Sequence, residues 1–321
     1  MKPLYLVDFS NFAYKFKAVH TYAKYDIKGV PVDLSVLVGF IRSLKQNMFN
    51  DIVIVLDGKP VNSLNLIPAY KGQRNKNSSD TVGVSKLETI KFLTKIGQRI
   101  NKNVWVCCAP CQEADQAISS IVHLVTNNEP PRAGMINTIN SKSIDEDPWL
   151  CKLNNGLQVE DFKWKDYNTV VVGTTDSDMK ALSIFDNVFI DTSTSGKAIK
   201  SEDTAKAVMG VNAYAIPIYK SIYGDVSDNV PGYNLPKELI SILDDTITSR
   251  EEQNSFIQHV ERQTLSNSQW KVFHKILEID GGVKFKTNLE VVQLRYYSNP
   301  IILSYSDYDI NTTINKYMLK L

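Results

Sequence analysis

The sequence predicts an α/β protein whose central sheet is dominated by parallel strands and carries helices on both faces. Three short apolar runs cover 3–8, 52–57 and 169–174. Helical periodicity separates these runs, and strands that are apolar on both faces are typical of a parallel sheet covered by helices. Each run ends at, or just before, an aspartate, so we expect an acidic side chain at the carboxyl end of each strand.

Apolar residues recur every three to four positions between and beyond the first two runs, which indicates helices. The helices expected in the first half of the chain cover 10–19, 33–48, 84–99 and 112–126. A further strand is expected at 104–107, where three apolar residues precede a cysteine. The stretch from 58 onward is polar and basic, and we expect a flexible loop or an extension that folds on binding.

The second half of the chain changes from α/β to helical character. Residues 127–167 are irregular and rich in Pro, Asn and acidic residues, which predicts an insertion. A helix is expected at 177–184 and a strand at 187–190, while the tail 291–321 mixes both patterns. The later helices are expected at 202–209, 212–222, 236–245, 251–262 and 267–278. We therefore expect an α/β core over 1–200 and a helical region over 201–321.

Composition and charge exclude several classes of protein. Hydrophobic residues make up 43% and charged residues 22%, as in ordinary folded proteins. The formal net charge is +1, so any surface that binds nucleic acid must be local. No apolar run is long enough for a membrane span, and the first residues lack the pattern of a signal peptide. The four cysteines lack the partners of a zinc site, so we expect reduced thiols and a cytoplasmic protein.

Eight carboxylates stand at expected strand ends, helix starts or turns that a parallel sheet would bring together. They are Asp8, Asp57, Glu113, Asp115, Asp176, Asp178, Asp225 and Asp228. Carboxylates gathered in one crevice repel one another unless a divalent cation lies between them. Oxygen ligands in this number suit two Mg²⁺ ions and phosphate chemistry, and Mn²⁺ should substitute for Mg²⁺.

Each group of carboxylates also has a structural alternative. Asp176 would cap a helix, with Asp178 in its first turn. Residues 228–232 would form a simple turn, and Glu113 with Asp115 would be a solvated first helical turn. The ordered series of all these groups favours the metal site over the separate alternatives.

Six motifs follow one another in a fixed order between residues 7 and 232. They are Val-Asp-Phe-Ser-Asn, Leu-Asp-Gly, Tyr-Lys-Gly-Gln-Arg, Glu-Ala-Asp, Thr-Thr-Asp-Ser-Asp and Gly-Asp-Val-Ser-Asp-Asn-Val-Pro-Gly. This series resembles the 5′-nuclease family, which includes flap endonucleases, the 5′-exonuclease domain of bacterial DNA polymerase I and the phage nucleases also called phage RNase H. The resemblance covers 1–245. It implies a PIN-like nuclease core, a basic arch over about 58–90 and a modified helix–hairpin–helix in the helical region.

The resemblance also implies roles for single residues. The eight carboxylates would hold two Mg²⁺ ions. Lys71 and Arg74 would be catalytic cations that stabilise the charge developing on the scissile phosphate. Lys76 would contact the phosphate backbone. Tyr70 would either stack on a base or anchor the loop on the core, and the sequence leaves both roles open.

Three departures from the family pattern affect what the resemblance implies. Gln116 stands where several bacterial and phage relatives have a further aspartate. The segment from Asp115 to Asp176 is longer than in many relatives, which matches the expected insertion. The hairpin 231–237 lacks the glycines that bring backbone amides close to duplex phosphates and a potassium ion. We therefore expect no potassium site, and we expect Lys237 to contact the duplex.

The function implied is a magnesium-dependent 5′-3′ exonuclease or flap endonuclease. Its expected substrates are DNA and RNA–DNA duplexes with a 5′ flap, a nick or an RNA primer, in phage replication. We expect a monomer without a membrane, working with replication proteins such as a single-strand-binding protein. Two alternatives stay open: a catalytically silent, structure-specific nucleic-acid-binding module, and a PIN-like ribonuclease, although the latter class usually lacks the long arch and the last motif.

Overall fold

A computed structural model describes residues 2–13, 32–73, 87–126, 157–192, 199–200, 210–295 and 300–317. Most of the expected helix 10–19, most of the expected insertion 127–167 and all of the expected helix 202–209 lie outside these residues. No helix within the described ranges combines the length and the apolar character that crossing a membrane requires.

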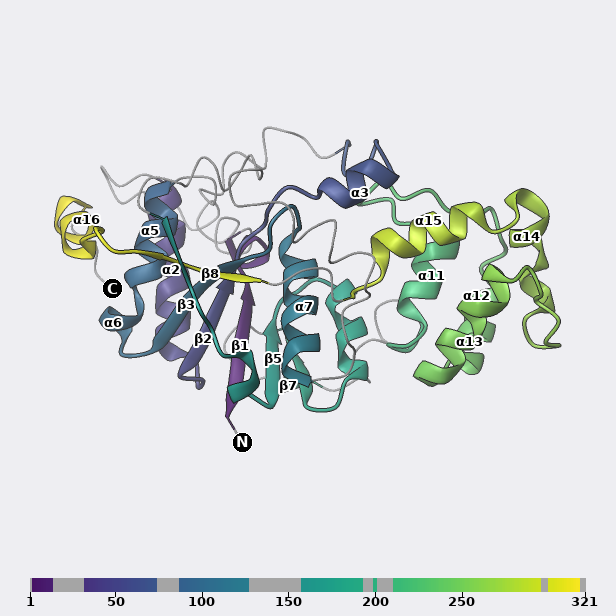
Figure 1. Cartoon of the computed structure of the whole chain (residues 1–321), viewed down its shortest axis with the longest axis horizontal. Coiled ribbons are helices and arrows are strands. Elements are labelled where there is room, and N and C mark those ends of the chain that lie inside the picture. Colours follow the sequence, from purple (N-terminus) through teal and green to yellow (C-terminus); the bar gives the residue numbers. More distant parts are fainter. Residues whose placement is uncertain are drawn as a thin grey trace.

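An eight-stranded sheet organises the N-terminal part of the molecule, in the order β4-β8-β3-β2-β1-β5-β6-β7 (Figure 1). The strands are β1 Pro3–Asp8, β2 Asp51–Val55, β3 Asn103–Cys108, β4 Leu157–Glu160, β5 Thr169–Gly173, β6 Val188–Asp191, β7 Ile199–Lys200 and β8 Ile301–Tyr305. The neighbours from β3 to β6 pair in parallel. Strands β4, β7 and β8 pair antiparallel. The predicted parallel-dominated α/β sheet is confirmed.

The strand register brings the predicted aspartates to one edge of the sheet. Asp8 lies opposite Val55, so Asp57 follows just beyond the end of β2. Val7 lies opposite Gly173, so Asp176 follows just beyond β5. Parallel strands run in the same direction, and their carboxyl ends therefore meet at the same edge.

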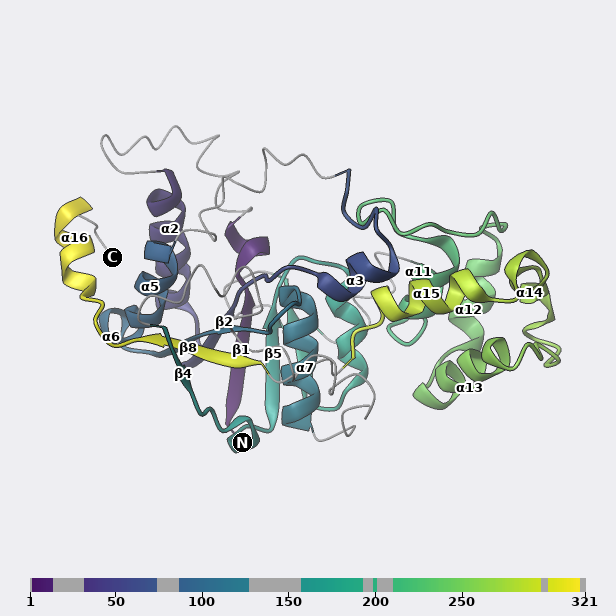
Figure 2. The same ribbon diagram turned by 45° about the horizontal axis from the view of Figure 1, so that its top comes forward.

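Helices cover both faces of the sheet, as the apolar strands require. The helices α2 (Val32–Gln46), α5 (Leu87–Lys95) and α6 (Gly97–Ile100) contribute to one core, together with Val7 of β1. The helix α7 (Ala114–Thr126) and the 3-10 helix η3 (Asp178–Ile184) contribute to a second core with Leu6. Successive strand residues point to opposite faces, so Leu6 and Val7 serve different cores. Figure 2 shows α2 and α5 on one side of β1 and β2, and α7 on the other.

A second group of helices extends from one end of the sheet (Figure 1). Its members are α11 Ile216–Tyr223, α12 Leu239–Thr246, α13 Arg250–Glu261, the 3-10 helix η4 Lys271–Phe273, α14 His274–Asp280 and α15 Val283–Val292. The ring of Phe256 contacts the rings of Trp270, Phe273 and Phe285, edge to face. This region therefore buries an apolar core of its own.

The chain returns to the sheet after α15. Strand β8 inserts between β3 and β4, and the helix α16 (Ile310–Tyr317) follows it. Strand β4 comes from the last part of the expected insertion 127–167 and pairs with β8 at the sheet edge. The sequence pattern of the tail predicts mixed structure but not this pairing, because an antiparallel strand contributed from so far along the chain leaves no local signal.

Residues 61–73 form a strap across the junction between the sheet and the helical region. The strap consists of the helix α3 (Val61–Leu66) and the turns that follow it. Its residues Ile67 and Tyr70 are buried against Val230 and Val291, and α3 lies close to one end of α15 in both views (Figures 1 and 2). The expectation of a flexible loop from 58 onward is therefore wrong for the strap. Its two apolar anchors are too few to give a readable periodicity.

Candidate metal centre

Three carboxylates form the tightest acidic group in the described part of the chain. The ligand oxygens of Asp178, Asp225 and Asp228 all lie within 4.8 Å of one another. We call these three residues the triad. Asp178 opens η3 just after β5, whereas the other two lie in the turn after α11. All three are partly exposed, so a cation could reach them from solvent.

The turn that carries two triad members is held by close backbone packing. Asp225 and Val230 exchange two backbone hydrogen bonds, of 3.0 and 2.9 Å. A Cβ atom on Gly232 would lie 2.1 Å from the carbonyl oxygen of Tyr223, so only glycine fits. The buried side chain of Asn288 donates to the carbonyl oxygens of Ser221 (3.0 Å) and Pro231 (2.6 Å). These contacts set the distance between Asp225 and Asp228.

Lys220 links the triad electrostatically. Its side chain is 6% exposed, and its ammonium group forms ion pairs with both Asp178 and Asp225. Burial alone would lower the pKa of Lys220, but the two carboxylates reverse this and raise it. The sequence analysis missed this residue. Its place on an expected helix, one and a half turns before Asp225, was the only available signal.

The two partners of Lys220 respond differently. Burial raises the pKa of Asp178 to about 6, although the ion pair with Lys220 opposes the rise. Burial would also raise the pKa of Asp225, but hydrogen bonds from Lys220 and Ser227 hold it below its ordinary value. The triad therefore joins one carboxylate that is stabilised as an anion to one that accepts a proton near neutral pH.

The other five predicted carboxylates lie close enough to influence one another. Burial raises the pKa of Asp8 to about 7, and the charges of Asp57 and Asp176 add to the rise. Burial also raises the pKa of Asp115 well above its ordinary value, and Glu113 contributes. Within the described ranges, however, no second set of three ligand atoms is as close as the triad.

Several of these carboxylates also accept backbone hydrogen bonds of the kinds that the structural alternatives require. Asp176 accepts from the amide of Asp178 at 3.0 Å, and Asp57 accepts from the amide of Ala114 at 2.9 Å. Asp225 accepts from the amide of Ser227 at 2.8 Å. These local hydrogen bonds coexist with the acidic group, but the N-cap of η3 is Ser177 rather than Asp176, and Glu113 is buried rather than solvated.

Tyr70 belongs to the strap and reaches both acidic groups. Its ring is buried at 6% exposure. Its hydroxyl lies 2.9 Å from Oε2 of Glu113 and 3.2 Å from Oδ2 of Asp228. Burial raises the pKa of this hydroxyl, with the neighbouring carboxylates contributing, so it stays protonated and able to donate. Of the two predicted roles, these contacts match the anchor, since a buried ring offers no face to a base.

Lys71 places its ammonium group beside the same two carboxylates, Glu113 and Asp228. Its Nζ lies 2.5 Å from Oε1 of Glu113 and 3.7 Å from Oδ2 of Asp228. Its backbone amide donates to the carbonyl oxygen of Asp228 at 2.8 Å. The remaining cations of the predicted motif, Arg74 and Lys76, lie outside the described residues.

Gln116 is buried, and its side-chain amide group is directed at the strap rather than at the neighbouring carboxylates. Its Nε2 lies 3.5 Å from Oγ of Ser63 in α3, and its Oε1 lies 3.4 Å from the amide of Glu113. An amide can donate to the strap, whereas an ionised carboxylate could only accept. The departure from the family pattern therefore connects α7 with the strap.

The triad borders an open depression of about 590 Å³ between α11 and the segment 224–237. Lys237 is exposed at its rim. The depression is lined by Asp176, Ser177, Asp178, Tyr219, Lys220, Tyr223, Gly224, Asp225, Val226, Ser227, Asp228, Tyr233, Asn234, Leu235 and Lys237. A volume of this size is typical of ligand sites.

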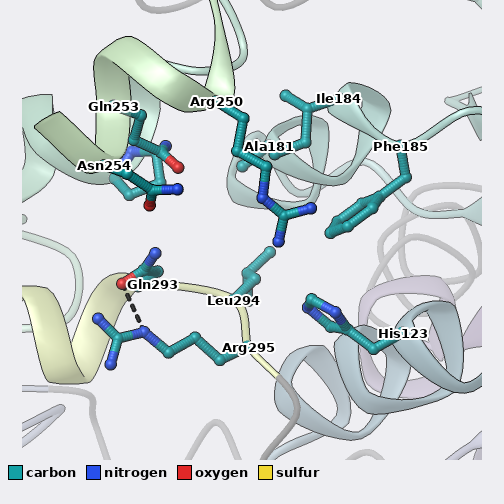
Figure 3. A pocket seen from close by; sticks show the side chains of 11 residues that line it. His123, Ala181, Ile184, Phe185, Arg250, Gln253, Asn254, Gln293, Leu294 and Arg295 are labelled. Carbon is teal, nitrogen blue, oxygen red and sulfur yellow. Dashed lines mark hydrogen bonds between the residues drawn. The ribbon is translucent and has the colours of Figure 1, made fainter. Parts of the chain in front are cut away.

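A second hollow lies between α7, η3, α13 and the end of α15 (Figure 3). Its volume is about 40 Å³, and it shares no residue with the depression beside the triad. The Arg250 guanidinium stacks over the Phe185 ring at 5.2 Å, while Arg295 donates to Gln293 (Figure 3). The contact between Arg250 and Phe185 joins α13 of the helical region to the end of η3, and the space is too small for a nucleotide.

The comparisons with known proteins find similar folds but no similar sequences among families or curated proteins. No protein-family profile matches the sequence, and no curated protein matches it. A structure of the bacteriophage T5 5′-exonuclease with bound zinc is 18% identical, with a TM-score of 0.52 over 92% of this chain and 91% of that chain. The bacteriophage T5 D15 flap endonuclease in a product complex with DNA and metal ions is also 18% identical, with a TM-score of 0.54 over 92% and 90%. The chain has the 5′-nuclease fold.

A further T5 D15 structure, crystallised with metal ions, gives a TM-score of 0.53 at 18% identity, over 92% of this chain and 91% of that chain. The expected resemblance to 5′-nucleases is confirmed at the level of the fold. Within this 5′-nuclease fold, six of the predicted carboxylates lie at or just beyond the carboxyl ends of the parallel strands, and Asp225 and Asp228 approach Asp178 from the turn after α11. The strap adds Lys71 to them, and α11 adds Lys220.

Proposed function

We propose that this chain is a metal-dependent, structure-specific 5′-nuclease that hydrolyses phosphodiester bonds at 5′ ends or flaps. The observation that supports this most strongly is the triad, within 4.8 Å, at the wall of a depression large enough for a nucleotide. The 5′-nuclease fold supports the same assignment, because the likeness covers more than nine-tenths of the chain.

The donor set fits a hard divalent cation. All ligands of the triad are carboxylate oxygens, which suit Mg²⁺ or Mn²⁺ better than a thiophilic metal. We propose one ion at the triad and a second near Asp8, Asp57, Glu113, Asp115 and Asp176. When bound, such ions activate the attacking water and neutralise charge on the phosphate and the leaving oxygen.

The chain's own cations would act beside these ions. Lys71 places an ammonium group between Glu113 and Asp228, where a scissile phosphate bound at the acidic groups would carry growing negative charge. Lys220 forms ion pairs with both Asp178 and Asp225 and so opposes the repulsion between these two carboxylates. Arg74 would be a second catalytic cation beside Lys71. The proposed contacts of Lys76 and Lys237 with phosphates would position the nucleic acid rather than take part in the reaction.

We also propose the substrates of the enzyme and its biological setting. The substrates would be DNA and RNA–DNA duplexes with a flap, a nick or an RNA primer, and the setting would be phage replication and primer removal in the host cytoplasm. The fold likeness to a bacteriophage T5 exonuclease supports this setting. The enzyme would work as a monomer, with replication proteins such as a single-strand-binding protein nearby.

The test is cleavage of a 5′-labelled flap duplex and a nicked RNA–DNA hybrid with Mg²⁺, Mn²⁺ or EDTA. Wild type is compared with Asp178→Asn and with Asp186→Asn, an exposed aspartate beyond η3 that serves as the control. We expect cutting near the flap junction or the 5′ end with either metal, loss of cutting in Asp178→Asn, and full activity in Asp186→Asn. The RNA–DNA hybrid decides whether primer removal is within reach of the enzyme.

Two outcomes would contradict the proposal. Tight binding to the flap without cutting in any metal would indicate a silent binding module, and Gln116→Asp would then be the first variant to assay. Cutting of single-stranded RNA at internal sites, without preference for a 5′ end, would indicate a PIN-like ribonuclease.

A further inference from the structure

Two tyrosines of α11 form a tilted pair of neighbouring rings beside the triad. The ring centroids of Tyr219 and Tyr223 are 5.0 Å apart, and the ring planes are inclined by 33°. The two residues are four positions apart, so they lie on one face of the helix. Both are partly exposed, and both line the depression of about 590 Å³.

The pair is tied closely to the acidic group. Lys220 follows Tyr219 directly and forms the ion pairs with Asp178 and Asp225. The hydroxyl of Tyr223 donates to the carbonyl oxygen of Pro236, between the lining residues Leu235 and Lys237, at 2.9 Å. The tyrosine rings therefore keep a defined position relative to the triad and to Lys237.

The chemistry of the walls matches the parts of a nucleotide. Carboxylates that suit a divalent cation line one side, an aromatic pair lines another, and the exposed ammonium group of Lys237 stands at the rim. Aromatic side chains stack on bases with little sequence preference, and lysines contact phosphates. The volume also lies in the usual range for sites that bind small ligands.

We propose that this depression is a nucleotide subsite of the nuclease, in which Tyr219 and Tyr223 stack on a base next to the scissile phosphate. Lys237 contacts a phosphate of the same strand. This inference rests on the proposed function, and it assigns a substrate contact to Tyr219 and Tyr223, which the predicted motifs leave without a role.

The competing explanation is that the tyrosines only cover the helical core, which they also contact. Two substitutions at the same position distinguish the explanations. Tyr219→Phe keeps the aromatic face, whereas Tyr219→Leu keeps apolar bulk without it. A packing role predicts similar behaviour for both variants, whereas a stacking role predicts loss in Tyr219→Leu alone.

The experiment uses the full chain and a flap duplex that carries 2-aminopurine at single positions around the junction. Binding is followed in Ca²⁺ by anisotropy and by quenching of the 2-aminopurine fluorescence, and KM and kcat are measured separately in Mg²⁺. We expect quenching at one position near the cleavage site in wild type and Tyr219→Phe. In Tyr219→Leu the quenching should disappear, and binding should weaken by at least about fivefold.

A second substitution, at the exposed Lys237, tests the subsite without disturbing the core. Lys237→Met should weaken binding to all flap sequences alike and reduce the salt dependence of binding by about one phosphate contact. The subsite is refuted if Tyr219→Leu, folded as judged by circular dichroism, retains the quenching and the wild-type KM. The fluorescence measurement does not need cleavage, so absence of cutting in wild type would count against the proposed function alone.

Discussion

The Nζ atom of Lys71 lies 2.5 Å from Oε1 of Glu113, and Lys71 adopts a left-handed backbone conformation with φ of 54°. Such a conformation is unfavourable for lysine, and residues with this strain often occur at functional sites. The same residue donates its amide to the Asp228 carbonyl. One strap residue therefore joins Glu113 at the sheet edge to Asp228, the triad member in the turn after α11.

Replacing Lys71 should impair cleavage far more than folding. Lys71→Met removes the ammonium group beside Glu113, and loss of one such electrostatic contact commonly lowers kcat by about a hundredfold or more. The control is Lys59→Met, which removes an exposed lysine just before α3. Single-turnover cleavage of the flap duplex measures the effect. Equal rates for Lys71→Met and Lys59→Met would exclude a role for Lys71 in the reaction.

Removing Lys220 should destabilise the metal-free protein. Lys220→Met leaves Asp178 and Asp225 without their shared cation, and breaking a buried ion pair costs about 3 kcal/mol or more. The loss should be smaller at pH 5 than at pH 8, because the pKa of Asp178 is about 6 and its protonated form needs no cation. Urea unfolding in EDTA at both pH values measures this.

The same variant should gain more stability from a metal than wild type does, because a bound cation would replace the missing charge. Thermal melting with increasing Mn²⁺ gives the comparison, with Lys275→Met in α14 as a control at an exposed lysine. A Mn²⁺ response in Lys220→Met no larger than in wild type would show that Lys220 and the cation do not share the triad.

The metal-free protein should become more stable as the pH falls from 8 toward 5. The pKa values of Asp8 and Asp178 are raised in the folded state to about 7 and about 6, above the value of about 3.9 for an unfolded aspartate. The folded state therefore binds protons that the unfolded state has already lost, and stability declines as the pH rises through this window. The lowered pKa of Asp225 acts in the opposite direction, but only below about pH 4.

Asp8→Asn provides the check on this pH dependence. The variant should be more stable than wild type at pH 8 in EDTA and should show a weaker rise in stability toward pH 5, while cleavage is lost. Denaturant titrations at pH 5, 6.5 and 8 measure the slope. A wild-type protein that loses stability steadily from pH 8 to pH 5 would contradict the raised pKa of Asp8.

Gly232→Ala should disrupt the triad. The added Cβ would lie 2.1 Å from the carbonyl oxygen of Tyr223, so the turn with Asp225 and Asp228 must shift. Overpacking of this kind costs about 1–3 kcal/mol. The control is Gly281→Ala, where the left-handed backbone with φ of 63° also makes alanine unfavourable, but far from the turn of the triad, so stability should fall without loss of the Mn²⁺ response or of cleavage. Stabilisation by Mn²⁺ and cleavage should both fall in Gly232→Ala. Retention of both would show that this turn does not position the metal ligands.

The sequence alone determined the parallel core and most of the acidic residues at its edge. The apolar sequences of 3–8 and 169–174 are enough to identify them as buried strands. Parallel strands then bring Asp8 and Asp176 to the same edge of the sheet, whatever loops connect them. The expected 177–184 helix was placed correctly, although it is a 3-10 helix, because its position depends on the strand before it.

Only the tertiary structure decided which charges meet. The contacts of Lys71 with Glu113, of Tyr70 with Asp228 and of Lys220 with Asp178 join segments that are distant in sequence. The same holds for β8, which inserts antiparallel beside β3. Local periodicity reports which face of an element is apolar, whereas the partner of a charged side chain depends on how remote elements pack, and no short-range pattern records that.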